Sequence, residues 1–433
     1  MRGEVDASPG ASHVPFARSQ VAPEALEEVT RVLKSGWLTT GPEVAEFERD
    51  VAEFVGAPHA IAVASCTTAI ELSLRALHLP TGAKVLTSTM TFCGAVHAIV
   101  HAGLRPVLVD VNPETLMPDA ATTAAAVRRE GPVDAMVALH FAGYPAPVEE
   151  MAEAAGLPLS RVIEDAAHGL GSVVGDRSVG TVSAATCFSF YATKNLPIGE
   201  GGMITTADPG IERHVRRARL HGMSRDAWKR YTPGASWRYE VDRAGLKANM
   251  TDVQAAIGRA HLRHFPSWQA RREELAARYD RQLADVPGIR PAPRPTRGRH
   301  AWHLYAIRVE PAYGMDRDAL SAELAARKVD CSVHFIPTHH HSYFLGLLGP
   351  EIAGELPGAD TVFSQILSLP LFQGLADEDV DRVCAEIADL YAGAPPQVNA
   401  IGNGHSNGNG HVNGNGRWRA KGWKVNGDML NGS

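Results

Sequence analysis

The stretch HAIAVASCTTAIELSLRALHLPTGAKVLTSTMTFCGAVHAIVHAGLRPVLVDV, residues 59–111, alternates short apolar runs with helical segments. The apolar runs are rich in β-formers, and Ile70, Leu74 and Leu77 recur at helical spacing between the first two runs. Strands that alternate with helices form βαβ units with a mostly parallel sheet covered on both faces. Similar runs continue along the chain, so we expect strands at 59–65, 83–92, 105–111, 135–141 and 161–165. The sequence therefore predicts an α/β fold with its ligand site at the carboxyl ends of the strands.

Composition and charge exclude several classes of protein. Of the 433 residues, 45% are hydrophobic and 21% are charged, the balance of a soluble globular protein with ample material for a core. A formal net charge of -6 disfavours nucleic acid as the main partner. Five scattered cysteines without a C-x-x-C motif argue against a disulfide framework and a structural zinc site. Since no run approaches about 18 apolar residues, we expect no membrane span and a cytoplasmic protein.

The pattern divides the chain into four parts. A long charged helical region begins after Thr251, and we expect it to break at Pro266 before a second set of strands and helices, with strands at 299–310 and at VHFIP (333–337). Gly/Asn repeats near the end cannot bury enough apolar surface to offset the entropy of ordering. Trp418 and Trp423, which follow these repeats, belong either to a docking patch or to a solvated end. We expect a flexible N-terminus (1–14), a large cofactor-binding domain (15–265), a small C-terminal α/β domain (266–394) and a disordered tail (395–433).

The segment ATCFSFYATKNLPIGEGGMITT (185–206) holds the strongest chemical signal. Its two apolar halves bracket a turn that carries Lys194. Burying an ammonium costs free energy unless its pKa falls or it forms an imine. A lysine with a lowered pKa suits Schiff-base chemistry with a carbonyl compound. A surface lysine in a hairpin turn is the alternative, and the spacing alone leaves both interpretations open.

Other segments place polar or aromatic side chains where strands end. The strand RVIED ends in Asp165, whose carboxylate suits a pyridinium nitrogen, and His168 follows; the alternatives are a helix cap and a core histidine. Ser65 and Thr67 at a strand-to-helix junction suit a phosphate, or form a plain N-cap. Phe92 either stacks on a flat ring or belongs to the core.

Taken together, these segments resemble the DegT/DnrJ/EryC1/StrS family of pyridoxal-phosphate (PLP)-dependent nucleotide-sugar aminotransferases. The motifs that carry the resemblance are GWLTTGPEVAEFE, VASCTTAIELSLRAL, MTFCGAVHAIVHAGLRPVLVDV, VIEDAAHGLGS, CFSFYATKNLPIGEGGMI and LKANMTDVQAAIG, in this order. F-S-F-x-x-x-K with an upstream E-D-A-A-H is a specific signature, and the resemblance runs from about residue 15 to 393. It implies the fold-type-I PLP-dependent transferase fold, with a large α/β/α domain and a smaller C-terminal α/β domain.

The resemblance implies a role for each site residue. Lys194 carries the cofactor as an imine and moves protons once freed, and Asp165 pairs with the pyridine nitrogen. Phe92 stacks on the ring, and His168 stands near its phenolic oxygen. Family members usually have glycine in place of Cys66, although a backbone amide contact survives that change. The cofactor phosphate is implied to lie against Ser65, Cys66, Thr67 and Ser189.

A shared active site is also implied. LKANMTD (246–252) resembles a segment that family members contribute from the neighbouring subunit, so we expect Asn249, with Lys247 beside it, at the partner's phosphate in a homodimer. The expected substrates are L-glutamate and a nucleotide-diphosphate-linked keto-deoxysugar, in deoxysugar and antibiotic biosynthesis. K-x-N-M-T-D and HFIPTHHHSYF (334–344) look more like C-4 than C-3 aminotransferases.

Several alternatives stay open. Within the family these are C-3 amination, amination of a cyclitol ketone, and sugar dehydration; the family's dehydratases replace the lysine by histidine, so Lys194 favours transamination. A PLP-binding regulator is an alternative from another class of protein. We find no recognisable helix-turn-helix or basic module in the sequence, which argues against a regulator.

The segment HFIPTHHH also invites a metal site. Neighbouring histidines in an extended loop point different ways, and we find no suitable carboxylate spacing, so we expect no metal. We instead assign this loop, and the loop WLTTGP at 37–42, to the sugar-nucleotide pocket.

Overall fold

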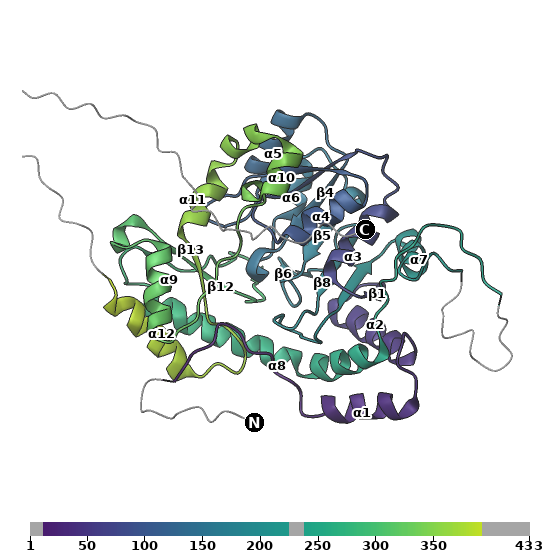
Figure 1. Cartoon of the computed structure of the whole chain (residues 1–433), viewed down its shortest axis with the longest axis horizontal. Coiled ribbons are helices and arrows are strands. Elements are labelled where there is room, and N and C mark those ends of the chain that lie inside the picture. Colours follow the sequence, from purple (N-terminus) through teal and green to yellow (C-terminus); the bar gives the residue numbers. More distant parts are fainter. Residues whose placement is uncertain (1–11, 225–237, 392–433) are drawn as a thin grey trace, which may run out of the picture. The chain divides into compact units, whose positions relative to one another are not determined.

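The five strands expected between residues 59 and 165 belong to one sheet, together with two later strands. The computed structural model describes residues 12–224 and 238–391, which Figure 1 draws in colour. Strands β3, β2, β4, β5 and β8 are parallel neighbours, while β9 runs antiparallel to both β8 and β1. The mostly parallel α/β sheet is thus confirmed. Its order is β1 (His59–Val63), β9 (Gly202–Thr206), β8 (Ala185–Ser189), β5 (Val162–Ala166), β4 (Ala135–Leu139), β2 (Lys84–Ser88) and β3 (Arg105–Val109).

Helices cover both faces of this sheet. Consecutive strand residues, such as Val85 and Leu86, point to opposite faces of the sheet and belong to different cores, as the two-residue period of a strand requires. One face packs against α3 (Cys66–Ala76), α4 (Cys93–His101) and α7 (Pro209–Ala218). The other face packs against α2 (Pro42–Val55) and α8 (Asp252–Leu283) near β1, and against α5 (Ala120–Glu130) and α6 (Val148–Ala154) near β3. Helix α1 (Ala25–Ser35) packs on α8.

The predicted strand at 83–92 is too long, because β2 ends at Ser88. Beyond that point the backbone leaves the sheet and bonds to a distant segment, since the carbonyl of Thr89 accepts from the N–H of Thr338 at 2.7 Å. Phe92 consequently lies at the N-cap of α4, four residues past the strand end.

Helix α8 corrects the expectation of a break at Pro266. The helix continues through this proline over 32 residues, although proline removes one backbone hydrogen bond. Packing on both sides offsets that loss, because Phe265 lies in the core beneath the large sheet while Leu275 and Tyr279 lie in a second core. Figure 1 shows α8 running along one edge of the molecule from α2 towards α12 (Asp377–Asp389). The predicted boundary at 265/266 therefore falls inside one helix.

A second, antiparallel sheet of three strands follows α8. It consists of β10 (Ile289–Arg290), β12 (Tyr305–Val309) and β13 (Ile366–Leu369), and it shares a core with α9 (Arg317–Ala326) and α12. Helices α10 (Ser342–Leu348) and α11 (Pro357–Gln365) lie between β12 and β13 in the chain. A third small sheet contains β11 (Gly298–Arg299), β6 (Val173–Val174) and β7 (Arg177–Ser178).

Two predicted strands of this half differ from the structure. The segment 299–310 contains β12 but not a continuous strand, because residues 300–304, called the strap below, bond to the loop at Ala142 and Gly143 instead of a strand. The segment VHFIP forms no strand; Ser332, just before it, makes one isolated bridge to Ser368.

The first described residues pack against the C-terminal half of the chain. Val14, inside the N-terminus expected to be flexible, is fully buried, and its backbone bonds to Lys328 at 2.9 Å and Asp330 at 3.0 Å. The tail with Trp418 and Trp423 lies outside the described residues. Within the described part, no helix combines the length and the apolar character needed to cross a bilayer.

Candidate active site

A cavity of about 490 Å³ opens where β1, β4, β5 and β8 end. Strand ends are where open parallel sheets place their ligands, and the sequence predicted the site there. The wall of the cavity contains eight of the nine residues expected to bind a cofactor: Ser65, Cys66, Thr67, Phe92, Asp165, His168, Ser189 and Lys194. The fold thus brings together side chains that lie up to 129 positions apart in the sequence.

Lys194 lies in the connection between the antiparallel strands β8 and β9, and its backbone N–H donates to the carbonyl of Tyr191 at 2.9 Å. The connection is a hairpin, but the lysine side chain is half-buried and lines the cavity, so the interpretation as a surface lysine is wrong. Burial lowers its pKa to about 8, against the opposing influence of Cys66 and Asp165. A larger fraction of this amine is therefore neutral at physiological pH than in an ordinary lysine.

Asp165 stands at the end of β5 and is 5% exposed. Its Oδ1 accepts a hydrogen bond from the N–H of Ala167 at 3.1 Å. In the described part of the chain β5 is followed by β6 and not by a helix, so this carboxylate is not a helix cap. Burial raises its pKa, while the Ala167 amide and the nearby Lys194 counteract that rise. A cationic nitrogen in the cavity would stabilise the ionised form of this carboxylate.

The first turn of α3 offers backbone donors to the cavity. A capping box occupies two of the first N–H groups, because Ser65 N–H donates to Thr68 Oγ1 at 3.1 Å and Thr68 N–H donates to Ser65 Oγ at 3.2 Å. The N–H groups of Cys66 and Thr67 belong to the helix start that lacks intrahelical acceptors. They suit an anion such as a phosphate.

Two glycines leave room around this turn. A Cβ on Gly202 would lie 2.5 Å from the carbonyl carbon of Ser65, and a Cβ on Gly94 would lie 2.6 Å from Thr67 Oγ1. The Cys66 thiol does not fill the space, because its Sγ turns inward, 3.4 Å from the carbonyl oxygen of Cys187 and 3.8 Å from Asp165 Oδ1. The backbone amide contact expected at Cys66 stays a prediction.

Phe92 is not a core residue. It lines the cavity with 63% of its surface exposed, and its ring lies 6.2 Å from that of Phe335. An exposed aromatic face at the mouth of a cavity is available to stack on a planar ring.

Two histidines in the cavity wall present opposite hydrogen-bonding groups. His168 Nδ1 accepts from the N–H of Ala142 at 3.1 Å, so its proton resides on Nε2. His303 Nδ1 faces the amide oxygen of Asn195 at 3.1 Å, which requires the proton on Nδ1 and leaves a lone pair on Nε2. Burial holds the pKa of both imidazoles well below its usual value, so both are neutral at physiological pH.

Several wall residues were missed by sequence reasoning, among them His303, Thr91, Tyr191 and Glu200. His303 belongs to a segment that the pattern assigned to a plain strand, and its only signal was a histidine in an otherwise apolar run. His334 and Phe335 also line the cavity, which supports the assignment of their loop to the ligand pocket.

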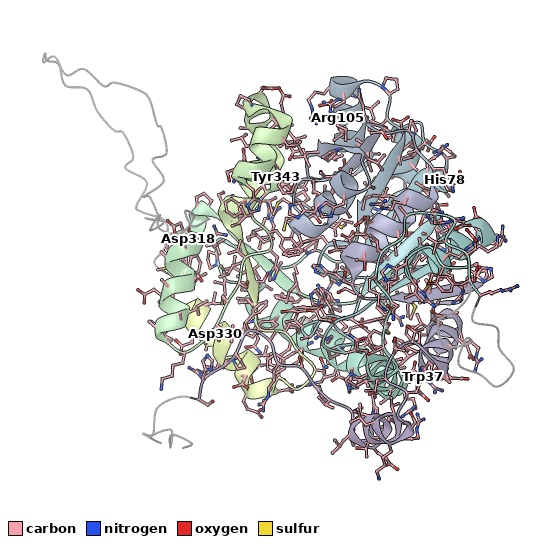
Figure 2. All side chains as sticks on the ribbon, turned by 45° about the vertical axis from the view of Figure 1, so that its right-hand side comes forward. Trp37, His78, Arg105, Asp318, Asp330 and Tyr343 are labelled. Atoms are coloured by element: carbon pink, nitrogen blue, oxygen red, sulfur yellow. The ribbon has the colours of Figure 1, made fainter. Side chains whose placement is uncertain are left out.

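Asn249 is the one predicted cofactor residue outside this cavity wall. Its Nδ2 donates to Thr40 Oγ1 at 2.7 Å, and Lys247 Nζ contacts its Oδ1. The loop at 37–42 lies beside it, since Thr40 Oγ1 also donates to the Met250 carbonyl at 2.6 Å. In Figure 2, Trp37 of this loop lies well away from Tyr343 of α10.

The histidine segment differs from the extended loop expected. Thr338–His340 forms a 3-10 turn, and His339 and His340 both direct Nε2 to Asp360 Oδ1, at 3.0 and 2.7 Å. His339 Nδ1 contacts Thr89 Oγ1 at 2.7 Å. The expectation that these side chains diverge and lack a carboxylate was therefore wrong. Both ring nitrogens of His339 thus have hydrogen-bonding partners, Asp360 and Thr89, and the absence of a metal stays a prediction.

The donor set of the cavity fits pyridoxal phosphate, the cofactor implied by the resemblance. An amine with a lowered pKa suits its aldehyde, a buried carboxylate suits its ring nitrogen, and the exposed Phe92 face suits the ring. The start of α3, where glycines replace side chains that would collide, suits the phosphate.

Comparisons with known proteins bear on the same region. The sequence model of the DegT/DnrJ/EryC1/StrS aminotransferase family matches residues 19–388. Spore coat polysaccharide biosynthesis protein SpsC of Bacillus subtilis (strain 168) is 41% identical over 383 residues, covering 88% of this chain and 98% of the relative. The aminotransferase TlmJ from Streptoalloteichus hindustanus is 34% identical with a TM-score of 0.77, covering 87% and 98%. The PLP form of the putative sugar aminotransferase Spr1654 from Streptococcus pneumoniae is 28% identical with a TM-score of 0.79, covering 88% and 99%.

Replacing Lys194 by methionine should stabilise the cofactor-free protein at neutral pH. The folded protein holds the pKa of this amine at about 8, against 10.5 for an ordinary lysine, so at lower pH the folded state carries an unfavourable ammonium. The gain should be greatest below pH 8 and should vanish as the pH rises from about 8 towards 10.5, where both states lose the charge.

Thermal unfolding of Lys194→Met and the unsubstituted protein across this pH range measures the effect. Lys84→Met is the control, because that lysine lies outside the cavity wall, with its Nζ against the carbonyl of Glu130. A difference in melting temperature that does not change with pH would contradict a partly buried amine.

Proposed function

Because the chain belongs to the DegT/DnrJ/EryC1/StrS aminotransferase family, we propose that it transfers the amino group of L-glutamate to C-4 of a nucleotide-diphosphate-linked keto-deoxysugar. Membership confirms the resemblance seen in the sequence. The chain is a PLP-dependent sugar aminotransferase of the fold-type-I class, as its family and its solved relatives are. The donor, the position and the nucleotide are the parts proposed here.

One observation carries the assignment of roles: Lys194 and Asp165 share a cavity with the start of α3. Lys194 Nζ would hold the cofactor covalently and, when free, would take up and return a proton, for which a pKa of about 8 is suited. When bound, the cofactor supplies an electron sink for charge that develops on the substrate carbon. Asp165 would keep the ring nitrogen protonated. The phosphate would lie against Ser65, Cys66, Thr67 and Ser189, with Phe92 on the ring and His168 Nε2–H at its oxygen.

The presence of Lys194 also favours transamination over dehydration. The family's dehydratases have histidine in place of this lysine, so the amine favours amino transfer over loss of water. The choice of C-4 over C-3 or a cyclitol ketone rests on K-x-N-M-T-D (247–252) and on the histidine segment, whose His334 and Phe335 line the cavity. Deoxysugar supply for antibiotic biosynthesis stays a prediction.

We further propose a homodimer with shared active sites. Asn249 and Lys247 contact each other just before the start of α8, outside the wall of their own chain's cavity. Among the described residues, the cavity wall contains no arginine, and Lys194 is its one lysine. Binding of two anionic ligands, a phosphate and the donor carboxylates, therefore favours additional cations or amides from a second subunit. Cytoplasmic location and the absence of a nucleic-acid partner stay predictions.

A panel of nucleotide-linked 3-keto and 4-keto sugars, assayed with L-glutamate, tests the proposed reaction. We expect one equivalent of 2-oxoglutarate for each aminated sugar, and NMR of the product should show the amino group at C-4. Aspartate and alanine serve as alternative donors in parallel assays. Amination at C-3, amination of a cyclitol ketone, or loss of water without 2-oxoglutarate would each replace the proposed reaction by a named alternative.

Mixing two defective chains tests the shared site. Lys194→Ala and Asn249→Ala should each be impaired alone, but a mixed dimer would contain one cavity with both native residues. Random mixing should therefore recover about one quarter of the unsubstituted activity. As the control, Lys194→Ala mixed with Asp165→Asn should recover nothing if each cavity is built from Lys194 and Asp165 of one chain. Formation of mixed dimers without recovery in the first mixture would contradict the shared site.

A further inference from the structure

The residue after Lys194 ties the lysine segment to the strap. Asn195 is 5% exposed, and its Nδ2 donates to the carbonyl of Ala301 at 2.7 Å. A carbonyl only accepts, so this bond fixes the orientation of the amide and turns Oδ1 towards His303. Oδ1 accepts from His303 Nδ1 at 3.1 Å. Two buried hydrogen bonds thus join the lysine connection of the large sheet to a segment more than 100 residues later.

The strap itself is held firmly. The N–H of Ala301 donates to Gly143 at 2.9 Å and that of His303 donates to Ala142 at 2.8 Å. Arg272 on α8 is 2% exposed, and its Nη1 donates to the carbonyl of Trp302 at 3.0 Å. Among the described residues, this guanidinium donates to backbone carbonyls and to one amide oxygen, and to no carboxylate. The buried Arg272 guanidinium therefore donates hydrogen bonds to main-chain oxygens of the strap.

Backbone strain occurs at the same place. Trp302 and Ala142 adopt φ angles of 49° and 57°, in the left-handed region that side chains disfavour. Ala142 donates its N–H to His168 and accepts from His303, while Trp302 directly precedes His303. Strained residues persist only where their surroundings enforce them, and they concentrate at functional sites. Here both of them position a cavity histidine.

We propose that Asn195 and His303 form a latch that positions Lys194, with His303 acting as a positioning residue through its Nδ1–H and the Asn195 side chain. The latch holds the connection between β8 and β9 against the strap, so that the amine stays in the cavity after it is released from a bound group. Its importance for turnover rests on the proposed function of Lys194, whereas its effect on the amine itself does not.

The charges around Lys194 agree with this arrangement. Asp165 on β5 and Cys66 on α3 face the amine, and the imidazoles of His168, His303 and His334 surround the same cavity. Burial keeps the pKa of His303 well below its usual value and lowers that of His334 to about 4. The three rings are thus neutral near pH 7, and His303 acts by hydrogen bonding and not by its charge.

Two substitutions of His303 distinguish loss of its hydrogen bond to Asn195 from loss of its imidazole ring. His303→Asn places an amide N–H near the position of Nδ1 and retains the bond to Asn195, whereas His303→Gln places its amide near Nε2 and loses that bond. Asn195→Ser removes the latch from the other side. His214→Asn is the matched control, because His214 on α7 also bonds through Nδ1, to Arg243 at 2.8 Å, but lies outside the cavity wall. Circular dichroism and thermal unfolding establish that each variant folds.

The first readout needs no catalysis. Amine-specific labelling of the cofactor-free protein, quantified on the Lys194 peptide over a pH series, reports the pKa of this amine. For the unsubstituted chain, His303→Asn and His214→Asn we expect a midpoint of about 8. His303→Gln and Asn195→Ser should raise the midpoint towards 10.5, because a looser connection admits water to the ammonium.

The second readout is the single-turnover rate of each half-reaction. A displaced lysine affects both equally, so His303→Gln and Asn195→Ser should slow the glutamate and the sugar half-reactions by a similar factor, about 10- to 100-fold. His303→Asn, which retains the bond to Asn195, should slow both half-reactions much less than His303→Gln does. An unchanged labelling midpoint in His303→Gln, equal losses in His303→Asn and His303→Gln, or a loss confined to the sugar half-reaction would each overturn the latch. If the proposed function is wrong, the unsubstituted enzyme shows no half-reaction, while the labelling midpoints still decide the latch.

Discussion

Lys194 carries its amine into a cavity that also holds the buried Asp165 carboxylate, and the remaining features of the site depend on this pairing. Burial lowers the pKa of the amine and raises the pKa of the carboxylate. The charge of each group opposes this shift in the other group's pKa. A nucleophilic amine near neutral pH and an anion ready for a ring nitrogen are the two requirements of PLP chemistry. The neutral imidazoles beside them add hydrogen bonds without adding charge.

The architecture supplies this pairing from both halves of the chain. Parallel strands bring Asp165 and the start of α3 to one edge of the large sheet, and the β8–β9 connection brings Lys194 there. The strap and the loop with His334 and Phe335 close the cavity from the C-terminal half. Helix α8 contributes to both cores, and its Arg272 fixes the strap. A site assembled from both halves explains why an unbroken helix joins them.

The sequence predicted the part of the site that follows from local pattern. Asp165 and Ser65 were found because apolar strands end just before or at them, and Lys194 because an ammonium between apolar strands demands a chemical reason. The family motifs then assigned their roles. The extent of β2 and the position of Phe92 were not predictable, because the strand ends where Thr89 bonds to Thr338 and His339, some 250 positions away. Helix α8 passes through Pro266 for the same kind of reason, since packing in two cores outweighs a local breaker. His303 was missed because its function lies in one long-range bond to Asn195.

Reduction of the PLP-loaded enzyme with borohydride, followed by mass analysis of its peptides, tests the central claim most directly. The account predicts one pyridoxyl group per chain, located on the peptide that contains Lys194, and no label in Lys194→Met. Label on another lysine, or a loaded enzyme that borohydride leaves unmodified, would contradict it.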